Sequence, residues 1–210
     1  MRKTISVFFI LCIFLLSIVT PGFAYSKIQN ARSVYKQFDD DNGKGEVVGD
    51  NYRLYAKKNS YTRYASIPQE AKNATAWDIE AEVLAMEGAG AGIFLVYSDK
   101  QGLGAEIAKD GALTFWYMET RRNEGIYKWK IAETRIPEVK IPSRLGVTYS
   151  YYTTEYSVTL NGKTLLSGKA SDSSFFPLML GFDTIGIKTI NSAAKQQGYC
   201  DFGEMVVNIN

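Results

Sequence analysis

The chain has 210 residues, of which 24 are Lys or Arg, 22 are Asp or Glu and none is His. The absence of histidine excludes Ser-His-Asp and Cys-His catalysis, zinc sites with His ligands and proton shuttling by His. Any chemistry therefore depends on carboxylates, Tyr, Lys or Arg. The near balance of charge favours neither nucleic acid nor an anionic membrane as a partner.

The first 24 residues have the pattern of a secretory signal peptide. Arg2 and Lys3 precede an apolar run, residues 5–19, and Gly22-Phe23-Ala24 forms a small-x-small cleavage site. The run is shorter than the roughly 18 to 20 residues that span a bilayer. We therefore expect cleavage near Ala24, a secreted or periplasmic protein, and no membrane insertion afterwards. Cleavage removes two basic residues and no acidic one, so the mature chain carries no formal net charge.

The mature chain of about 186 residues suits one domain with a sizeable core. We expect an irregular segment, residues 25–45, that packs on a single domain formed by residues 46–210. Cys200 is the one cysteine left after cleavage, so no intrachain disulfide is expected and the core must supply the stability. Cys200 lies in an apolar alternation, which is typical of a small buried side chain.

An acidic turn, residues 38–43, closes the N-terminal segment. Asp39 and Asp41 offer the hard oxygen ligands that calcium requires. The spacing fails the EF-hand template, because Lys44 stands where the invariant glycine would be. We expect a solvated turn and no cofactor, with calcium as the alternative.

Twelve segments of the mature chain show the period of two that is typical of β-strands. Asn161-Gly162 separates two of them, and this pair is the strongest short-range hairpin signal because both residues tolerate positive φ. No amphipathic helical run follows the signal peptide. The pattern predicts an all-β fold, an antiparallel sandwich of two sheets. The expected strands are residues 52–57, 61–66, 77–83, 92–98, 104–108, 112–119, 126–131, 144–152, 156–160, 163–167, 178–187 and 200–208.

The glycine-rich run Gly88-Ala89-Gly90-Ala91-Gly92 has the composition of a phosphate-binding loop. Ile93, however, takes the last glycine position of the dinucleotide fingerprint, and the run joins two strands instead of opening a helix. We expect a mobile loop between strands here.

Asp78, Glu80 and Glu82 occupy alternate positions of one strand, so they point to one face about 6.5 to 7 Å apart along the backbone. Retaining glycosidases use two carboxyl groups about 5 to 5.5 Å apart, which such side chains can reach. The laminarinase and lichenase family carries a strand with Glu, Asp and Glu on one face; this strand begins with Asp, has Glu at its centre and has a shorter spacing. The alternative interpretation is the solvated face of an amphipathic strand.

Aromatic residues are abundant, with 14 Tyr, 11 Phe and 3 Trp. Their flat rings can cover the C–H face of a pyranose while polar neighbours bond its hydroxyls. Most are in phase with core residues, but Trp116 is out of phase with them, so we expect it on an outer face. Tyr152, Arg121 and Arg122 are the polar or stacking candidates that complete the expected ligand-binding site. Scattered surface aromatics are the alternative.

The order of several short segments resembles the concanavalin A-like lectin/glucanase superfamily, most closely its laminin-G-like and 3-keto-disaccharide-hydrolase-like members. These segments are Phe38-Asp39-Asp40, residues 51–55, 77–83, 92–96 and 145–147, Leu160-Asn161-Gly162-Lys163, residues 185–187 and residues 200–207. The resemblance covers nearly all of the mature chain. It implies a two-sheet jelly roll whose curved sheet or edge loops often bind carbohydrate.

Three functions follow as hypotheses, because one fold hosts many functions. The first is a secreted, non-catalytic module that binds carbohydrate or a cell-surface polymer through Trp116 and its neighbours. The second is a glycoside hydrolase that uses two of the carboxylates at 78, 80 and 82. The third is a structural or protein-interaction domain of the cell envelope, in which residues 87–92 or 188–198 contact a partner.

Overall fold

The computed structural model describes residues 25–57, 62–68, 74–97, 101–121, 125–173, 182, 184–191 and 197–210. The expected signal peptide and Arg122 lie outside the described residues. Within these ranges, no helix has both the length and the apolar character needed to cross a bilayer.

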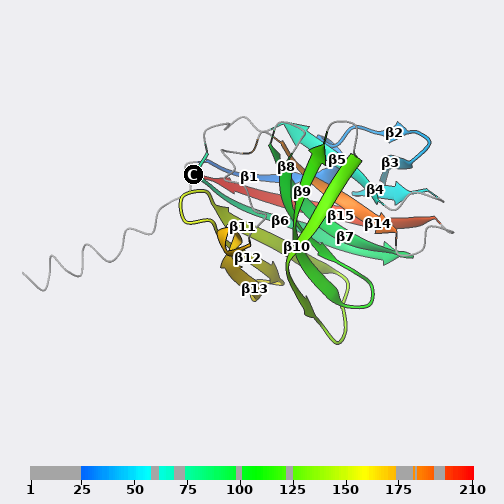
Figure 1. Ribbon diagram of the computed structural model, residues 1–210. Helices are drawn as coiled ribbons and strands as arrows, with labels where there is room; N and C mark the ends of the chain where they lie inside the picture. The colour runs from blue at the N-terminus through cyan, green and yellow to red at the C-terminus, as the bar shows by residue number, and fades with distance from the viewer. Residues whose placement is uncertain are drawn as a thin grey trace, which may run out of the picture.

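Two antiparallel sheets form a sandwich, which confirms the predicted fold class (Figure 1). The nine-stranded sheet has the order β13 (Lys163–Lys169), β12 (Glu155–Leu160), β11 (Ser143–Ser150), β6 (Ala76–Glu87), β15 (Gly198–Ile209), β4 (Asn51–Ala56), β3 (Gly43–Val48) and β2 (Phe38–Asp39), and β1 (Tyr25–Asn30) also pairs with β15. In Figure 1, β13 and β2 lie at opposite ends of this sheet.

The six-stranded sheet forms the second layer. Its order is β10 (Gly125–Arg135), β9 (Ala112–Arg121), β8 (Gln101–Ile107), β7 (Ala89–Tyr97), β14 (Thr184–Asn191) and β5 (Thr62–Pro68). The helical elements of the described residues are short: α2 (Ala31–Val34) and a single 3₁₀ turn, η1 (Ala170–Asp172). Antiparallel pairing therefore determines where almost every side chain points.

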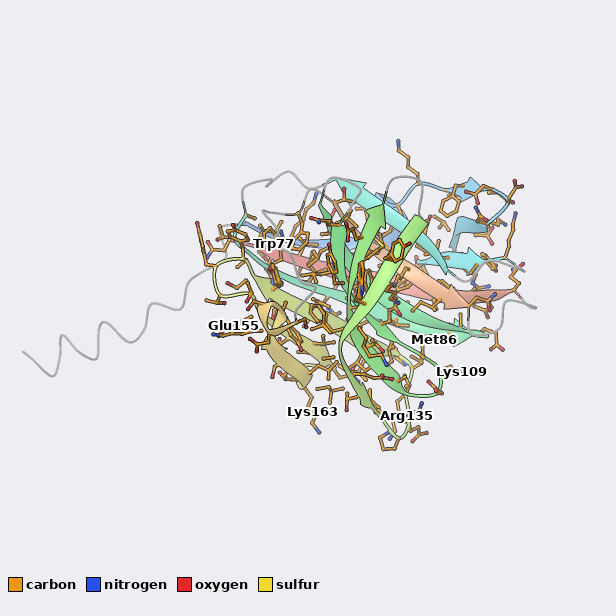
Figure 2. The ribbon with its side chains drawn as sticks, in the orientation of Figure 1. Trp77, Met86, Lys109, Arg135, Glu155 and Lys163 are labelled. Carbon is orange, nitrogen blue, oxygen red and sulfur yellow. The ribbon has the colours of Figure 1, made fainter. Side chains whose placement is uncertain are left out.

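The core lies between the two sheets and follows the predicted alternation. On β6, Trp77, Ile79, Ala81 and Val83 are buried, while the residues between them face outward. Trp77, labelled in Figure 2, packs edge-on against Phe182 with ring centroids 4.8 Å apart. Burial of such large apolar side chains is the dominant stabilising term for this sandwich, in which Cys200 is a free thiol.

Two local predictions are confirmed, one for a turn and one for a buried side chain. Asn161 and Gly162 form the turn between β12 and β13 with φ of 53° and 75°, the left-handed conformation that the Asn-Gly pair favours. Cys200 is buried in the core, where its thiol lies 3.2 Å from the carbonyl oxygen of Gly90.

The expectation of an irregular segment over residues 25–45 is wrong. β1 pairs with β15 over its whole length, from Tyr25 opposite Ile209 to Asn30 opposite Glu204, and α2, β2 and the start of β3 follow it. The sequence of β1, Tyr-Ser-Lys-Ile-Gln-Asn, has no apolar alternation, and its Ile28 side chain is exposed. Its backbone hydrogen bonds to β15, which no local pattern reveals, make it a strand.

The expectation of a loop over the glycine-rich run is also wrong. Only Gly88, at φ 60°, lies between β6 and β7, and the rest of the run belongs to β7. A Cβ atom on Gly90 would come within 2.5 Å of the Ile107 carbonyl oxygen on β8, so the strand passes too close to its neighbour for a side chain there. These glycines serve close strand packing.

Candidate functional site

Asp78, Glu80 and Glu82 project from the outer face of β6, as the period of two predicts, because the residues between them are buried. Each carboxylate has a partner on a neighbouring strand. The partners are the Asn208 side-chain amide, 3.1 Å from Asp78; the Arg144 guanidinium, 3.9 Å from Glu80; and the Glu204 backbone N–H, which donates to Glu82 over 3.1 Å. The three side chains thus form a polar row that is tied to β11 and β15.

Arg144 connects this row to β15. Its Nη2 atom donates to Glu204 Oε1 over 2.8 Å, and this bond raises the pKa of the guanidinium above its usual value. Because Arg144 also lies near Glu80, one cation serves carboxylates of two strands. The row therefore combines hydrogen bonds and an ion pair across three neighbouring strands.

Trp116 points away from the core, as its phase predicts, while its chain neighbours Phe115 and Tyr117 belong to the core between the sheets. On the outer side of the six-stranded sheet it packs in a small separate cluster with Phe94, Val96 and Met118. The Trp116 side chain is nevertheless only 2% exposed. The ring is therefore covered.

Two lysines from different strands cover the Trp116 ring. The ammonium nitrogen of Lys188, on β14, lies 3.9 Å from the ring centroid, and that of Lys128, on β10, lies 5.0 Å from it. Cations above an indole face are attracted by the ring quadrupole, most strongly where water is excluded. The Lys188 side chain is 7% exposed and that of Lys128 is 43% exposed, so Lys128 is the solvent-facing member.

Glu106, on β8, accepts hydrogen bonds from both lysines at the same oxygen, Oε1. Its side chain is 12% exposed. Burial lowers the pKa of Lys128 to about 8 and that of Lys188 well below its ordinary value, because an ammonium group loses hydration there. We call Glu106, Trp116, Lys128 and Lys188 the Trp116 cluster.

Two glycines make room for this cluster. A Cβ atom on Gly104 would lie 2.4 Å from Cζ2 of Trp116, and one on Gly92 would lie 2.9 Å from Cγ and Cε of Lys188. In the sheet register Gly104 is opposite Trp116, and Gly92 is opposite both Glu106 and Lys188. The sheet is thus hollowed at the two positions where the large side chains lie down on it.

The other residues of the expected ligand site do not join the Trp116 cluster through any contact among the described residues. Tyr152 is exposed in the turn after β11, in the other sheet, where its ring packs against Tyr151 with centroids 5.3 Å apart. The Arg121 backbone ends β9 opposite Gly125, and its side chain, like Arg122, lies outside the described part of the chain.

The acidic turn is organised by hydrogen bonds and one ion pair. Asp39 pairs with Lys57, and the bond to Lys57 lowers the pKa of the Asp39 carboxyl. Asp40 accepts from the backbone N–H groups of Asn42 and Gly43, each over 3.0 Å. Among the described residues, no three His, Cys, Asp or Glu side chains, those of Asp39 and Asp41 included, gather in a way that would hold a metal ion.

A second charged and aromatic group lies on the nine-stranded sheet. Arg53 on β4 makes a two-point ion pair with the buried Asp201 of β15, with distances of 2.6 and 2.8 Å. The guanidinium carbon of Arg53 lies 4.2 Å from the centroid of the Tyr199 ring. Tyr55 packs against Tyr199 with ring centroids 5.5 Å apart. This group fixes β4 against β15.

Sequence reasoning found Trp116 but missed Glu106, Lys128 and Lys188. One signal was available: Lys188 is the single charged residue of β14, Thr-Ile-Gly-Ile-Lys-Thr-Ile-Asn, which is otherwise typical of a buried strand. A lysine in such a strand indicates a partner on a neighbouring strand, since buried charges are paired.

Comparisons with known proteins show similarity in structure alone. No family model matches the sequence, and no curated protein is significantly similar to it. A glycoside hydrolase family 16 endo-glucanase from Bacteroides ovatus matches with a TM-score of 0.53 and 8% identity, over 88% of this chain and 94% of that one. The β-glucanase of Bacillus licheniformis matches with a TM-score of 0.51 and 10% identity, over 90% and 99%. The carbohydrate recognition domain of Emp46p matches with a TM-score of 0.52 and 13% identity, over 87% and 88%.

Proposed function

Because the chain has the concanavalin A-like jelly-roll fold, we propose that it is a secreted, non-catalytic module that binds carbohydrate or a cell-surface polymer. Structures similar to it include a carbohydrate recognition domain and two glucanases, so the scaffold is one on which saccharides are held. Fold alone does not separate binding from hydrolysis. The proposal therefore depends on the side chains that the two outer faces present.

The Trp116 cluster is the observation that carries the proposal. An indole ring lies on the outer side of the sheet beneath two ammonium groups that share one carboxylate, so the cluster offers hydrogen-bonding groups to a sugar beside an aromatic ring. These groups are separate from the main core, which lies on the opposite side of the sheet. Lys128 has a long, partly exposed side chain, so it is the member of the cluster that a ligand can reach from solvent.

The test measures retention and chain cleavage together. Purified protein is passed over immobilised polysaccharides and cell-wall fractions, with and without calcium, and released reducing ends are assayed in the same samples. We expect retention without release, and weaker retention for Trp116→Ala and Lys128→Ala variants that circular dichroism shows to be folded. Unchanged retention in both variants would place the site elsewhere. The lack of retention on any polymer would contradict the proposal and favour a protein-interaction domain.

A glycoside hydrolase is the second candidate, and the polar row of β6 favours it. Asp78, Glu80 and Glu82 share the outer face of the strand, and retaining glycosidases use a pair of carboxyl groups as acid and nucleophile. If reducing ends are released, Glu80→Gln should abolish release. Glu155→Gln, an exposed change on β12 (Figure 2), should leave release intact. Undiminished turnover by Glu80→Gln would exclude this assignment.

The secreted or periplasmic location belongs to the same proposal and is supported by the sequence of residues 1–24. N-terminal sequencing of the protein recovered outside the cytoplasm should begin at Tyr25. Recovery of a membrane-bound protein that still begins at Met1 would contradict this location.

A further inference from the structure

The Trp116 cluster carries more positive than negative charge. Lys128 and Lys188 donate to one oxygen of Glu106, so two ammonium groups share a single carboxylate. In the described part of the chain, neither lysine forms an ion pair with a second carboxylate. Lys130, the next lysine on this face of β10, is paired with Glu133 and adds no free charge. With both lysines protonated, the cluster has one cation in excess.

An excess charge at this place is unfavourable without a counter-ion. The Lys188 side chain is almost completely buried, and Glu106 is nearly so. Removing an ammonium group from water is costly unless a nearby anion and hydrogen bonds replace its hydration. A single carboxylate oxygen replaces the lost hydration of one ammonium group better than that of two. The cluster is therefore suited to accept a second anionic group.

The Trp116 ring adds one further hydrogen-bond donor to the cluster. The indole Nε1–H of Trp116 is buried and has no hydrogen-bond partner among the described residues. A buried donor without a partner is uncommon in folded proteins. A ligand would reach the cluster from solvent beside Lys128, because its side chain is the partly exposed member.

We propose that the Trp116 cluster recognises an acidic saccharide, a polysaccharide whose sugar units carry a carboxylate, and that this carboxylate binds between the ammonium groups of Lys128 and Lys188. The inference rests on the carbohydrate-binding function proposed above and specifies its ligand class. Ligand oxygens accept hydrogen bonds from both lysines, and the sugar lies on the solvent side of Lys128. Glu106 keeps its bond to Lys188 and so holds that lysine in place.

The experiment compares each acidic polymer with its own neutral form. Polygalacturonate, alginate and hyaluronan are each paired with a carboxyl-reduced counterpart that has the same backbone and no charge. Affinities are measured by affinity electrophoresis, together with neutral β-glucan and xylan. We expect at least one acidic polymer to bind about tenfold tighter than its reduced counterpart, since charge-assisted hydrogen bonds are lost on reduction.

A variant that removes one ammonium group tests the site itself. Lys128→Met keeps the apolar stem and removes the charge, and it should abolish the preference, so that the acidic and the reduced polymer bind with equal affinity. Lys163→Met is the matched control, because Lys163 is an exposed lysine at the start of β13 in the other sheet (Figure 2), and it should leave the preference unchanged.

The outcomes separate the two proposals. Equal affinity for acidic and reduced polymers, or binding to the neutral glycans alone, would overturn the acidic ligand and leave carbohydrate binding standing. A preference for acidic polymers that Lys128→Met does not change would overturn the assigned site. The absence of binding to every polymer would overturn both the ligand class and the carbohydrate-binding function.

Discussion

The ammonium nitrogen of Lys188 lies 3.9 Å from the centroid of the Trp116 ring, on the outer side of the six-stranded sheet. A cation–π contact of this kind contributes about 2 kcal/mol where water is excluded. That is less than the several kcal/mol that burying an ammonium group costs. The hydrogen bond from Lys188 to Glu106 must supply the remainder, so Glu106 is the residue on which the cluster depends.

Glu106→Gln is therefore expected to destabilise the protein strongly. The change leaves two buried or half-buried ammonium groups with no carboxylate, a loss of about 3 to 5 kcal/mol in the free energy of unfolding. Lys188→Met is the contrasting variant, because Glu106 keeps Lys128 as its partner and the new side chain has a similar volume. Its effect should stay within about 1 kcal/mol. Urea denaturation measures the free energy of unfolding of both variants. Equal losses would show that the charge of Lys188 is itself needed for stability.

Gly104→Ala should disturb the Trp116 cluster by steric overlap. The added methyl group would meet Cζ2 of Trp116 at 2.4 Å and the Ile93 carbonyl oxygen at 2.5 Å, so either the ring or the strand must shift. We expect a loss of about 1 to 3 kcal/mol and a changed Trp fluorescence spectrum. Gly168→Ala is the control, since its nearest neighbour is the Tyr156 side chain at 3.2 Å. A wild-type spectrum and stability for Gly104→Ala would contradict this packing.

Arg53→Met should cost much more than the loss of an exposed ion pair. Asp201 is buried beside β4, and without Arg53 its carboxylate loses both of its guanidinium hydrogen bonds. The expected loss is about 3 to 5 kcal/mol. Arg135→Met, at the end of β10 (Figure 2), breaks the exposed pair with Asp110 and should cost less than about 1 kcal/mol. Thermal or urea unfolding measures the loss of stability in both variants. Similar losses would contradict the buried ion pair between Arg53 and Asp201.

Cys200 should make the protein less stable as the pH rises above 9. Burial raises the pKa of its thiol from 9.0 to about 12. Below pH 9 the thiol is protonated in both the folded and the unfolded chain, so it has no effect. Between these two pKa values the unfolded chain releases the proton and the folded chain keeps it, so the free energy of unfolding falls by up to about 1.4 kcal/mol per pH unit.

Cys200→Ala isolates this contribution from other groups that titrate in the same range, such as Lys128, whose pKa is lowered to about 8. The variant will be less stable at pH 8, because a buried sulfur atom is removed. Its stability should nevertheless fall less steeply than that of the wild type between pH 9 and 10.5. Parallel curves for the two proteins would show that the thiol ionises equally in both states.

The layers of the fold were predictable because they depend on local signals. The alternation on β6 and the Asn161-Gly162 turn both act within a few residues, and both are confirmed. β1 was missed because its strand character comes from hydrogen bonds to β15, about 180 residues away in the sequence. The glycines of β7 were misread because their cause, the close approach of β8, is equally remote.

The candidate site was predictable only in part, for the same reason. The phase of Trp116 against Phe115 and Tyr117 placed it correctly on the outer side of its sheet. Its partners come from three other strands, β8, β10 and β14, and the sheet register alone brings them together. A single sequence contains no local signal for that register. The sequence therefore could not reveal that two lysines bury Trp116.

β15 is the last strand of the sandwich to be synthesised, yet it lies inside the nine-stranded sheet, between β6 on one side and β4 and β1 on the other (Figure 1). Before it emerges from the ribosome, β6 and β4 have no common neighbour and each presents an unpaired edge. Such nascent edges are prone to association with other chains. β15 therefore closes the open edges of β6 and β4 in a single step, and any chain that lacks it keeps both edges exposed.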